Sequence, residues 1–337
     1  MSVRVGVIGI GMIGQDHIRR MSTVLSGTTV VAVSDVDLAR AQEVADAVAA
    51  RVHPTGQDLI GDGDVDAVLV ASWGGTHEEY VLAAIEAGKP VFCEKPLATT
   101  QKACLRIIEA EVAAGRRLVQ VGFMRRYDEA YRALKAVVAG GTIGTPLIMH
   151  CTHRNPGVPS YYESDSAITD TAVHEIDIVR WMFDEEIVAA TVLNPRRSRH
   201  GGELQDPMIL LLEMASGIIV DVEISVNIRY GYDIRGEVVC EDGTAALGES
   251  SPVTVRHEGA VTNRVPADWR ERFIRAYDIE LQEWADAVRS GGDLGPSSWD
   301  GYAAQAVCDA GVKALYGGER VSIELTTKPE LYGRAPR

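Results

Sequence analysis

A glycine-rich turn near the start of the chain places the strongest constraint on its fold. Val3–Ile8 is a short, Val-rich apolar run, and a G-x-G-x-x-G sequence follows it directly. In such a turn the first glycine allows a tight bend, the second lets a pyrophosphate approach the backbone, and the third lets a helix pack against the strand. Free amides at the helix start then bind phosphate. The turn predicts a dinucleotide site that includes Gly9, Gly11, Met12, Ile13 and Gly14.

The N-terminal part alternates short apolar runs with amphipathic stretches, a pattern typical of parallel α/β domains. The predicted buried strands are Val3–Ile8, Val30–Ser34, Ala67–Ala71, Pro90–Cys93 and Leu118–Val121. The predicted helices are Ile13–Leu25, Asp37–Ala50, Thr76–Ala87, Thr99–Ala114 and Tyr127–Ala139. We therefore expect residues 1–122 to form a Rossmann domain with a doubly wound parallel sheet.

The pattern changes after about residue 145, where strands follow one another with hairpin-length loops between neighbours. The predicted strands are Pro146–Arg154, Ile187–Leu193, Pro207–Met214, Gly217–Asn227, Asp233–Cys240, Thr244–Leu247 and Pro252–Arg256. The predicted helices are Asp170–Phe183, Arg270–Arg289 and Trp299–Tyr316. Residues 123–337 are thus expected to form a second, α+β domain with a mainly antiparallel sheet. Its last helix is a candidate to pack back on the first domain.

Charge and composition exclude several classes of partner. The chain has 33 Lys and Arg against 48 Asp and Glu, a net charge of −15, which disfavours nucleic acids and anionic membranes. The N-terminus lacks the features of a signal peptide, and no apolar run approaches the roughly 20 residues that cross a bilayer, so a cytoplasmic location is expected. The five cysteines are scattered and no Cys or His cluster has ligand spacing, so no metal site is predicted.

The second predicted strand ends at Asp35, where a carboxylate accepts hydrogen bonds from the adenosine ribose hydroxyls. A carboxylate there repels a 2′-phosphate, and neither flanking residue, Ser34 or Val36, is cationic. NAD is therefore favoured over NADP, although Arg40 lies close enough to weaken the discrimination.

Two short motifs carry side chains suited to proton transfer. Lys95 lies in Glu94-Lys95-Pro96, just after a predicted buried strand, where open α/β sheets bind ligands. Asp170 and His174 are four residues apart and would share one face of a helix, where the carboxylate could orient the imidazole as a general base. Taken alone, a surface lysine and an ordinary helix contact remain the alternative interpretations.

Several sequence blocks resemble one enzyme family. GIGMIG at Gly9, EKP at Glu94 and DTAVHEID at Asp170 resemble the family of glucose-fructose oxidoreductase and inositol dehydrogenase. Further blocks resemble its bacterial myo-inositol 2-dehydrogenases: GFMRRYD from Gly122, HRNP from His153, HEIDIVRW from His174, YGYD from Tyr230, AYDIE from Ala276 and SSWDGYAA from Ser297. The resemblance runs in order along nearly the whole chain.

The resemblance implies a fold and a set of site residues. It implies a Rossmann domain followed by an open antiparallel sheet, often assembled as a homotetramer. Lys95, Asp170 and His174 fall on the family's catalytic positions. Ser72, Trp73, His77, Glu94 and Lys95 are expected near the cofactor. Positions that line the polyol pocket correspond to Arg125, Asn155, Tyr232 and Tyr277. Related sequences often carry proline in the Ser72–His77 turn, where this chain has Gly75, and we expect a looser turn there.

The function implied is the NAD-dependent oxidation of myo-inositol, or a close cyclic polyol, to the inosose ketone as part of polyol catabolism. His174 would remove the hydroxyl proton, Asp170 would orient the imidazole, and Lys95 would polarise the oxygen. The alternatives are a dehydrogenase for scyllo-inositol, chiro-inositol or an aldose and, from another class, a non-catalytic NAD-binding redox regulator.

Overall fold

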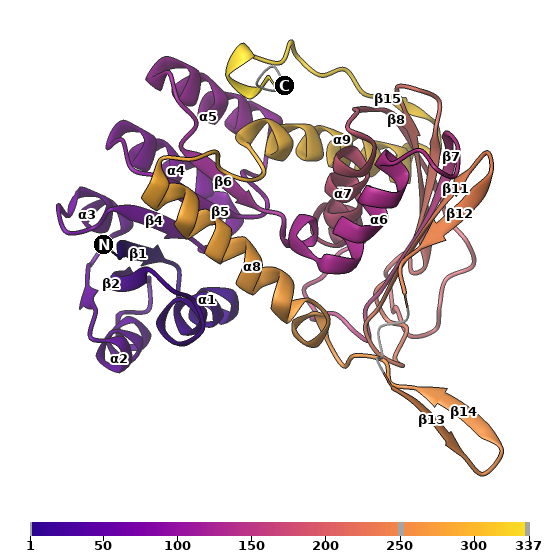
Figure 1. Cartoon of the computed structure of the whole chain (residues 1–337), viewed down its shortest axis with the longest axis horizontal. Helices are drawn as coiled ribbons and strands as arrows, with labels where there is room; N and C mark the ends of the chain where they lie inside the picture. The colour runs from indigo at the N-terminus through magenta and orange to yellow at the C-terminus, as the bar shows by residue number, and fades with distance from the viewer. Residues whose placement is uncertain (1, 249–252, 334–337) are drawn as a thin grey trace. The chain divides into compact units, whose positions relative to one another are not determined.

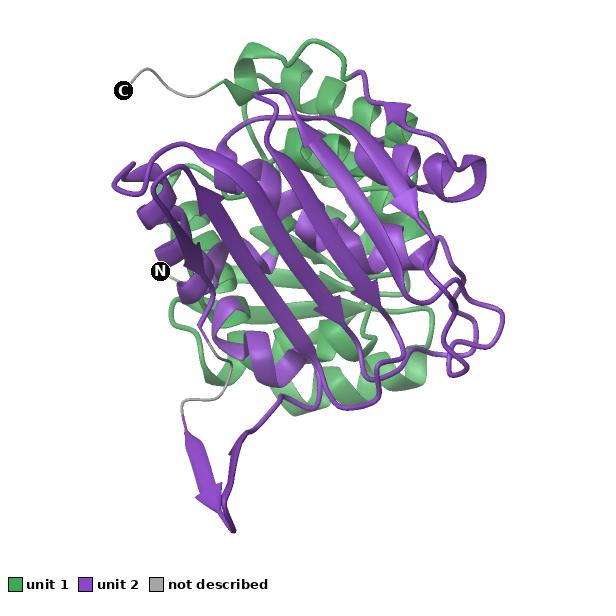
Figure 2. Ribbon diagram, turned by 90° about the vertical axis from the view of Figure 1, so that its right-hand side faces the viewer, with its two compact units in different colours: residues 1–123, 277–305, 325–337 green, residues 124–276, 306–324 purple. Residues whose placement is uncertain are grey.

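The computed structural model describes residues 2–248 and 253–333. The chain divides into two compact units (Figure 2). Residues up to 123, residues 277–305 and those from 325 onward form the first unit, and residues 124–276 and 306–324 form the second.

The first unit is built on a six-stranded parallel sheet in the order β3-β2-β1-β4-β5-β6 (Figure 1). Its strands are β1 Val3–Ile8, β2 Thr28–Ser34, β3 Arg51–Val52, β4 Ala67–Val70, β5 Val91–Glu94 and β6 Val119–Gly122. Its helices include α1 Met12–Thr23, α2 Leu38–Val48, α3 Gly56–Gly61, α4 His77–Glu86 and α5 Gln101–Ala114. The strand order reverses between β1 and β4, and doubly wound sheets bind ligands at the carboxyl ends of strands at such a point.

The predicted Rossmann sheet is confirmed, with one edge strand and one helix missing from the prediction. β3 contains only two residues and α3 only six, so neither carries enough residues to show a hydrophobic period. Both lie between β2 and β4, in a stretch where no hydrophobic period predicts a strand or a helix.

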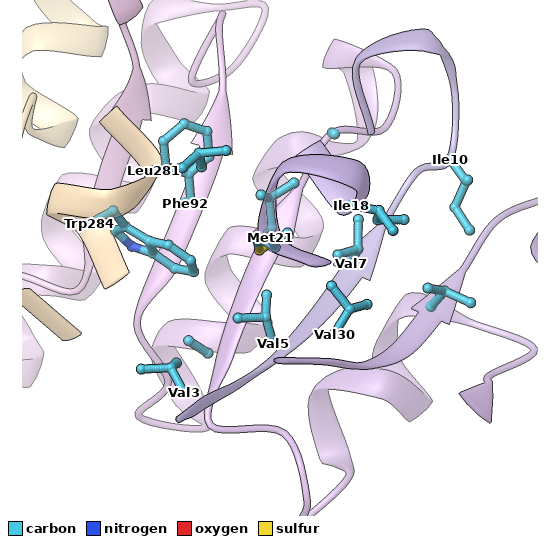
Figure 3. Close-up of a cluster of buried hydrophobic side chains, with 14 of the residues drawn as sticks. Val3, Val5, Val7, Ile10, Ile18, Met21, Val30, Phe92, Leu281 and Trp284 are labelled. Atoms are coloured by element: carbon cyan, nitrogen blue, oxygen red, sulfur yellow. The ribbon is translucent and has the colours of Figure 1, made fainter. Parts of the chain in front are cut away.

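The core of the first unit includes a helix from the far end of the chain. Buried side chains of β1, β2 and α1 pack together, and α8 (Trp269–Ser290) adds Leu281 and Trp284 beside Phe92 of β5 (Figure 3). The Trp284 and Phe92 rings meet edge to face, with centroids 5.8 Å apart. Burial of this apolar face places residues 277–305 in the first unit, so the unit differs from the predicted division at residue 122.

The second unit is built on a seven-stranded mixed sheet in the order β12-β11-β7-β10-β9-β8-β15. Its strands are β7 Pro146–Arg154, β8 Ile187–Leu193, β9 Met208–Met214, β10 Ile219–Ser225, β11 Asp233–Cys240, β12 Gly243–Ala246 and β15 Val321–Ser322. Its helices include α6 Glu129–Ala139, α7 Val173–Phe183, the first turns of α8 (Trp269–Ser290) and the later part of α9 Ser298–Gly317. Neighbouring strands are antiparallel except β7 and β10, so the predicted, mainly antiparallel sheet is confirmed.

Alternating burial along the strands shows that this sheet has one covered face. In β9, Met208, Leu210, Leu212 and Met214 are buried, and the residues between them are not. The predicted strand Pro252–Arg256 begins outside the described residues. Its remainder belongs to β13 (Thr254–His257), which pairs with β14 (Ala260–Asn263) in a separate two-stranded hairpin.

Two kinds of feature are absent from residues 2–248 and 253–333. None of the helices there is both long and apolar enough to cross a membrane. No group of three or more His, Cys, Asp or Glu residues within the same ranges could hold a metal ion. The five cysteines are buried free thiols.

Trp284 and Trp73, one buried and one exposed tryptophan of the first unit, provide a matched test of core packing. Trp284→Ala should lower the free energy of unfolding by about 3–5 kcal/mol, because it opens a cavity beside Phe92. Trp73→Ala should change it by about 0.5 kcal/mol or less, because that indole is 80% exposed. Urea unfolding without cofactor, followed by circular dichroism, measures both values, and equal losses would contradict the assignment of α8 to this core.

Candidate functional site

The glycine turn brings the ends of β1 and β4 into close contact. Gly9 has a φ of +88°, and a Cβ there would lie 2.4 Å from the backbone nitrogen of Ser72. A Cβ on Gly14 would lie 2.0 Å from the Gly9 carbonyl oxygen, so α1 can pack this close only with glycine at that position. The two glycines therefore serve the fold of the turn.

Gly11 is different, because its surroundings are open. Among the residues that the structure describes, a Cβ there would meet no atom within 4 Å, and no side chain caps the start of α1. The helix therefore begins with uncapped amides beside open space, where a pyrophosphate can approach. A dinucleotide fits this site through Gly11, Met12 and Ile13.

Asp35 directly follows β2, and its side chain binds the backbone of the glycine turn. One carboxylate oxygen accepts a hydrogen bond from Ile10 N at 2.6 Å, and the other accepts one from Asp37 N at 2.8 Å. The Arg40 guanidinium lies 3.6 Å from Asp35 and 3.1 Å from Asp37. Asp35 thus lies beside the glycine turn, and Arg40 is paired with carboxylates. Its contact with the adenosine ribose stays a prediction.

The segment after β4 is a tight turn. Gly74–Thr76 is a 3₁₀ turn, and Ser72 Oγ lies 2.8 Å from Thr76 Oγ1. A Cβ on Gly75 would lie 2.3 Å from the Trp73 ring. The expectation that Gly75 loosens the turn is therefore wrong, because the glycine makes room for the indole.

His77 is buried and contacts two backbone carbonyls. Nδ1 lies 2.7 Å from Pro96 O, and Nε2 lies 2.9 Å from Ser72 O. The ring thus links the turn after β4 to the turn after β5. Both ring nitrogens lie at backbone carbonyls, which gives His77 a structural role in joining the two turns. Its contact with the cofactor stays a prediction.

The lysine motif follows β5 and includes a buried acid. Glu94 lies 2.7 Å from Nε2 of His17, a fully buried residue of α1. Its second oxygen accepts a hydrogen bond from Lys95 N at 3.2 Å. Glu94, predicted as a cofactor contact, therefore also fixes the backbone at Lys95.

In the second unit, Asp170 and His174 lie at the junction of two kinds of helix. Asp170 belongs to a π-helical turn, Ala167–Ala172, and His174 to the first turn of α7. The prediction of a regular helix from Asp170 is therefore wrong at its start. A π turn has i→i+5 hydrogen bonds, so the spacing of 3.6 residues per turn does not apply, and such turns often occur at functional sites.

A buried charged cluster lies close to these residues. The Arg125 guanidinium contacts the Glu175 carboxylate, and both side chains are 1% exposed. His153 Nδ1 lies 2.9 Å from Glu175 and 3.1 Å from Arg125. The rings of His153 and His174 have centroids 6.5 Å apart, so the cluster adjoins the predicted general base.

The cluster fixes the charge of each member. Burial alone would lower the pKa of Arg125, but the Glu175 carboxylate outweighs it and raises the pKa above its ordinary value. Burial alone would raise the pKa of Glu175, but Arg125 and His153 hold it below its ordinary value. Burial lowers the pKa of His153, and the nearby Glu175 charge does not offset this effect. At neutral pH the cluster is thus an ion pair beside a neutral imidazole.

The predicted polyol-binding residues belong to different units. Tyr232 packs edge to face on His153, with centroids 5.6 Å apart, and burial raises its pKa to about 12, so its phenol stays neutral. The side-chain amide nitrogen of Asn155, Nδ2, donates a hydrogen bond to Thr171 Oγ1 at 3.4 Å. Tyr277 belongs to the first unit, where it packs against His17 with centroids 5.8 Å apart.

The structure thus gathers the predicted residues into two groups. Lys95 and the cofactor residues are in the first unit, together with Tyr277. Asp170, His174, Arg125, Asn155 and Tyr232 are in the second. Sequence analysis did not assign His17, His153 or Glu175 to the site, although His153 and Glu175 lie in two of the quoted blocks, HRNP and HEIDIVRW.

Comparison with known proteins gives two family matches. A model described as "Oxidoreductase family, NAD-binding Rossmann fold" matches residues 3–123. A second model, the GFO/IDH/MocA C-terminal domain, matches residues 131–246.

Individual relatives match over almost the whole chain. Inositol 2-dehydrogenase 3 of Saccharopolyspora erythraea is 58% identical over 334 residues, covering 99% of both chains. A crystal structure of myo-inositol dehydrogenase from Lactobacillus casei in complex with NAD(H) and myo-inositol is 40% identical, with a TM-score of 0.96 over 98% of this chain and 100% of that one. A scyllo-inositol dehydrogenase from the same organism, 23% identical with a TM-score of 0.88 over 96% and 99% of the chains, shares the fold.

Two glycine substitutions separate the fold of the turn from its ligand site. Gly11→Ala should leave the unfolding free energy without cofactor within about 0.5 kcal/mol of the parent, because its methyl group meets no protein atom. It should raise the Kd for NAD about tenfold or more, because the methyl group fills the space of the pyrophosphate. Gly14→Ala should destabilise the protein even without NAD. Tight NAD binding by Gly11→Ala in titration calorimetry would contradict this site.

The buried cluster predicts a pH-dependent loss of stability. Glu175→Gln should lower the free energy of unfolding by about 3–5 kcal/mol at neutral pH, because it leaves the Arg125 charge buried without its partner. The folded-state pKa of Glu175 lies below its ordinary value of 4.5, so its stabilisation is present above that pH and is lost as the pH falls through the folded-state pKa. The difference between variant and parent should therefore shrink below about pH 4.5.

Denaturant unfolding across this pH range measures that difference, with Glu213→Gln as the matched control. Glu213 pairs with Arg320 on the surface, so its change should amount to about 0–1 kcal/mol. A difference for Glu175→Gln that is small or independent of pH would contradict the charged state assigned to the cluster.

Proposed function

The chain belongs to the GFO/IDH/MocA family of NAD-binding oxidoreductases, and on this premise we propose that it oxidises myo-inositol, or a close cyclic polyol, at a ring hydroxyl to the inosose ketone. The observation that carries the proposal is the end-to-end likeness to inositol 2-dehydrogenases, which spans the positions of both groups of candidate residues. The resemblance stated from the sequence blocks is confirmed at the level of the family.

The proposed chemistry divides the work among three side chains. NAD, when bound, accepts the hydride from the carbon that is oxidised. His174 takes the hydroxyl proton, Asp170 orients the ring and stabilises its cation, and the Lys95 ammonium donates a hydrogen bond to the same oxygen. The carbon loses a hydride and the oxygen loses a proton, which leaves a ketone.

The second unit supplies groups that suit a polyhydroxylated substrate. Asn155 offers an amide that both donates and accepts, and Tyr232 offers a phenol that stays neutral. Arg125 was predicted to bind the polyol directly, but its guanidinium is 1% exposed and paired with Glu175. We therefore assign Arg125 the role of fixing Glu175 and the neutral His153 beside the substrate groups.

The finer features expected from the sequence stay part of this proposal. They are a homotetrameric assembly, a place in polyol catabolism, a cytoplasmic location, and a preference for myo-inositol over its isomers. The chemistry of the site accepts several hydroxyls and does not by itself distinguish stereoisomers.

A substrate panel tests the proposal directly. Purified protein with NAD is offered myo-, scyllo- and chiro-inositol and glucose, and NADH formation is followed at 340 nm. We expect the highest kcat/KM with myo-inositol. A clear preference for another isomer or for glucose would change the assigned substrate, and tight NAD binding without turnover on any of them would favour a redox regulator. NADP in place of NAD should give lower kcat/KM.

Two substitutions test the proposed chemistry. Lys95→Ala and His174→Ala should each lower kcat by roughly two orders of magnitude or more, while the Kd for NAD changes little, because proton transfer and polarisation act on the substrate. Lys102→Ala and His257→Ala, at exposed positions, serve as controls and should leave kcat unchanged. Normal turnover in either test variant would remove that residue from the mechanism.

A further inference from the structure

Two buried histidines of the first unit flank the Glu94-Lys95-Pro96 turn, and the proposed chemistry assigns neither of them. We propose that His17 and His77 are positioning residues that fix the backbone on the two sides of Lys95, an inference that rests on the proposed role of that lysine. They would act on the reaction through Lys95 and would not contact the reacting atoms.

His17 acts through Glu94. Its ring is fully buried, and Nε2 lies 2.7 Å from a Glu94 carboxylate oxygen, so Nε2 carries the hydrogen and donates it. The other ring nitrogen, Nδ1, is buried and finds no hydrogen-bond partner among the described residues. A carboxylate can only accept, so the hydrogen bond runs from His17 Nε2 to Glu94.

Glu94 in turn binds the backbone of Lys95. Its second carboxylate oxygen accepts a hydrogen bond from Lys95 N at 3.2 Å. On the neighbouring strand β6, a Cβ at Gly122 would lie 3.0 Å from that same oxygen. The carboxylate is therefore confined by a hydrogen-bond donor from α1 and by the β6 backbone, and its position sets that of the Lys95 amide.

His77 holds the residue that follows the lysine. Its Nδ1 lies 2.7 Å from Pro96 O, and its Nε2 lies 2.9 Å from Ser72 O, at the start of the turn after β4. The ring is 1% exposed. The lysine turn is thus tied to α1 on one side, through Glu94, and to α4 and the cofactor-side turn on the other.

Such a device is useful because proton transfer and hydrogen bonding depend steeply on position. A catalytic group has to be held within about 0.5 Å of its productive place, and a displacement of about 1 Å can lower the rate about 100-fold. Lysine has a long, flexible side chain, so a fixed backbone is the part of its placement that the fold can control.

A purely structural role for His17 is the competing explanation. The ring also packs edge to face on Phe92, with centroids 5.9 Å apart, and against Tyr277. His17→Leu keeps an apolar side chain in this space but removes the donor to Glu94. His17→Gln keeps an N–H donor at nearly the same reach, so the two variants separate packing from hydrogen bonding.

The test is a double-mutant cycle with myo-inositol and NAD. We expect His17→Leu to lower kcat about 10- to 100-fold, with KM and the Kd for NAD within about threefold of the parent. His17→Gln should recover kcat to within about fivefold. In the Lys95→Ala background, His17→Leu should lower kcat less than about twofold further, because the residue through which it acts is gone. His77→Leu should show the same non-additivity.

A second perturbation covers the case in which His17→Leu does not fold. Gly122→Ala pushes on the Glu94 carboxylate without changing His17, and it should lower kcat in the parent but not in the Lys95→Ala background. Gly61→Ala is the matched control, because a Cβ there meets no atom within 4 Å and kcat should stay unchanged.

The outcomes distinguish this inference from the proposed function. Equal losses of kcat in the parent and Lys95→Ala backgrounds would overturn the positioning role and leave the role of Lys95 in place. So would a failure of His17→Gln to recover more activity than His17→Leu. Normal turnover in Lys95→Ala would overturn the proposed role of Lys95, and the positioning inference with it.

Discussion

The close approach of two backbones at the ends of β1 and β4 is the constraint on which the first unit depends. Gly9 packs against Ser72 with no room for a Cβ, and Gly14 lets α1 start directly over the turn. This packing orients the uncapped start of α1 toward the open space at Gly11. It also places His17, about one helical turn after Gly14, against Glu94 at the end of β5. The dinucleotide site and the support of the lysine turn thus come from one packing arrangement.

The second unit depends on a different interaction, a charged pair kept out of water. Removing Arg125 and Glu175 from water carries a large desolvation penalty, which their attraction offsets only because each side chain has further partners. His153 contacts both charges, and the ring of Phe273 lies 5.3 Å from the guanidinium carbon. The cluster thereby presents a neutral imidazole next to the ring of His174. In the proposed mechanism the two charges position neighbouring side chains and do not contact the reacting atoms.

Both units show the same way of building a reactive site. In the first unit, Lys95 is proposed to touch the substrate, and Glu94 and His17 hold its backbone. In the second unit, His174 is proposed to touch the substrate and lies beside the ring of His153, which contacts Glu175 and Arg125. A rigid surrounding shell of this kind reduces the reorganisation that a reaction would otherwise need. It also makes these residues sensitive to substitution for reasons that their distance from the substrate would not suggest.

Local sequence patterns determined a large part of this protein. The Val-rich strands, the glycine turn, Asp35 at the end of β2 and Lys95 after β5 follow from hydrophobic period and turn chemistry, which act over a few residues and can be read directly. The blocks shared with a known family pointed to the remaining site residues. Short elements such as β3 were not predicted, because a strand of two residues is too short to show a hydrophobic alternation.

Only the tertiary structure decided which of these residues stand beside one another. His17 and Glu94 are 77 positions apart, and Arg125 and Glu175 are 50 apart, so neither pair leaves a local signal. The assignment of α8 to the first core and the burial of Arg125 likewise depend on packing between distant segments. The physical reason is that burial and pairing are properties of the folded whole, whereas strand period and glycine turns are properties of the chain itself.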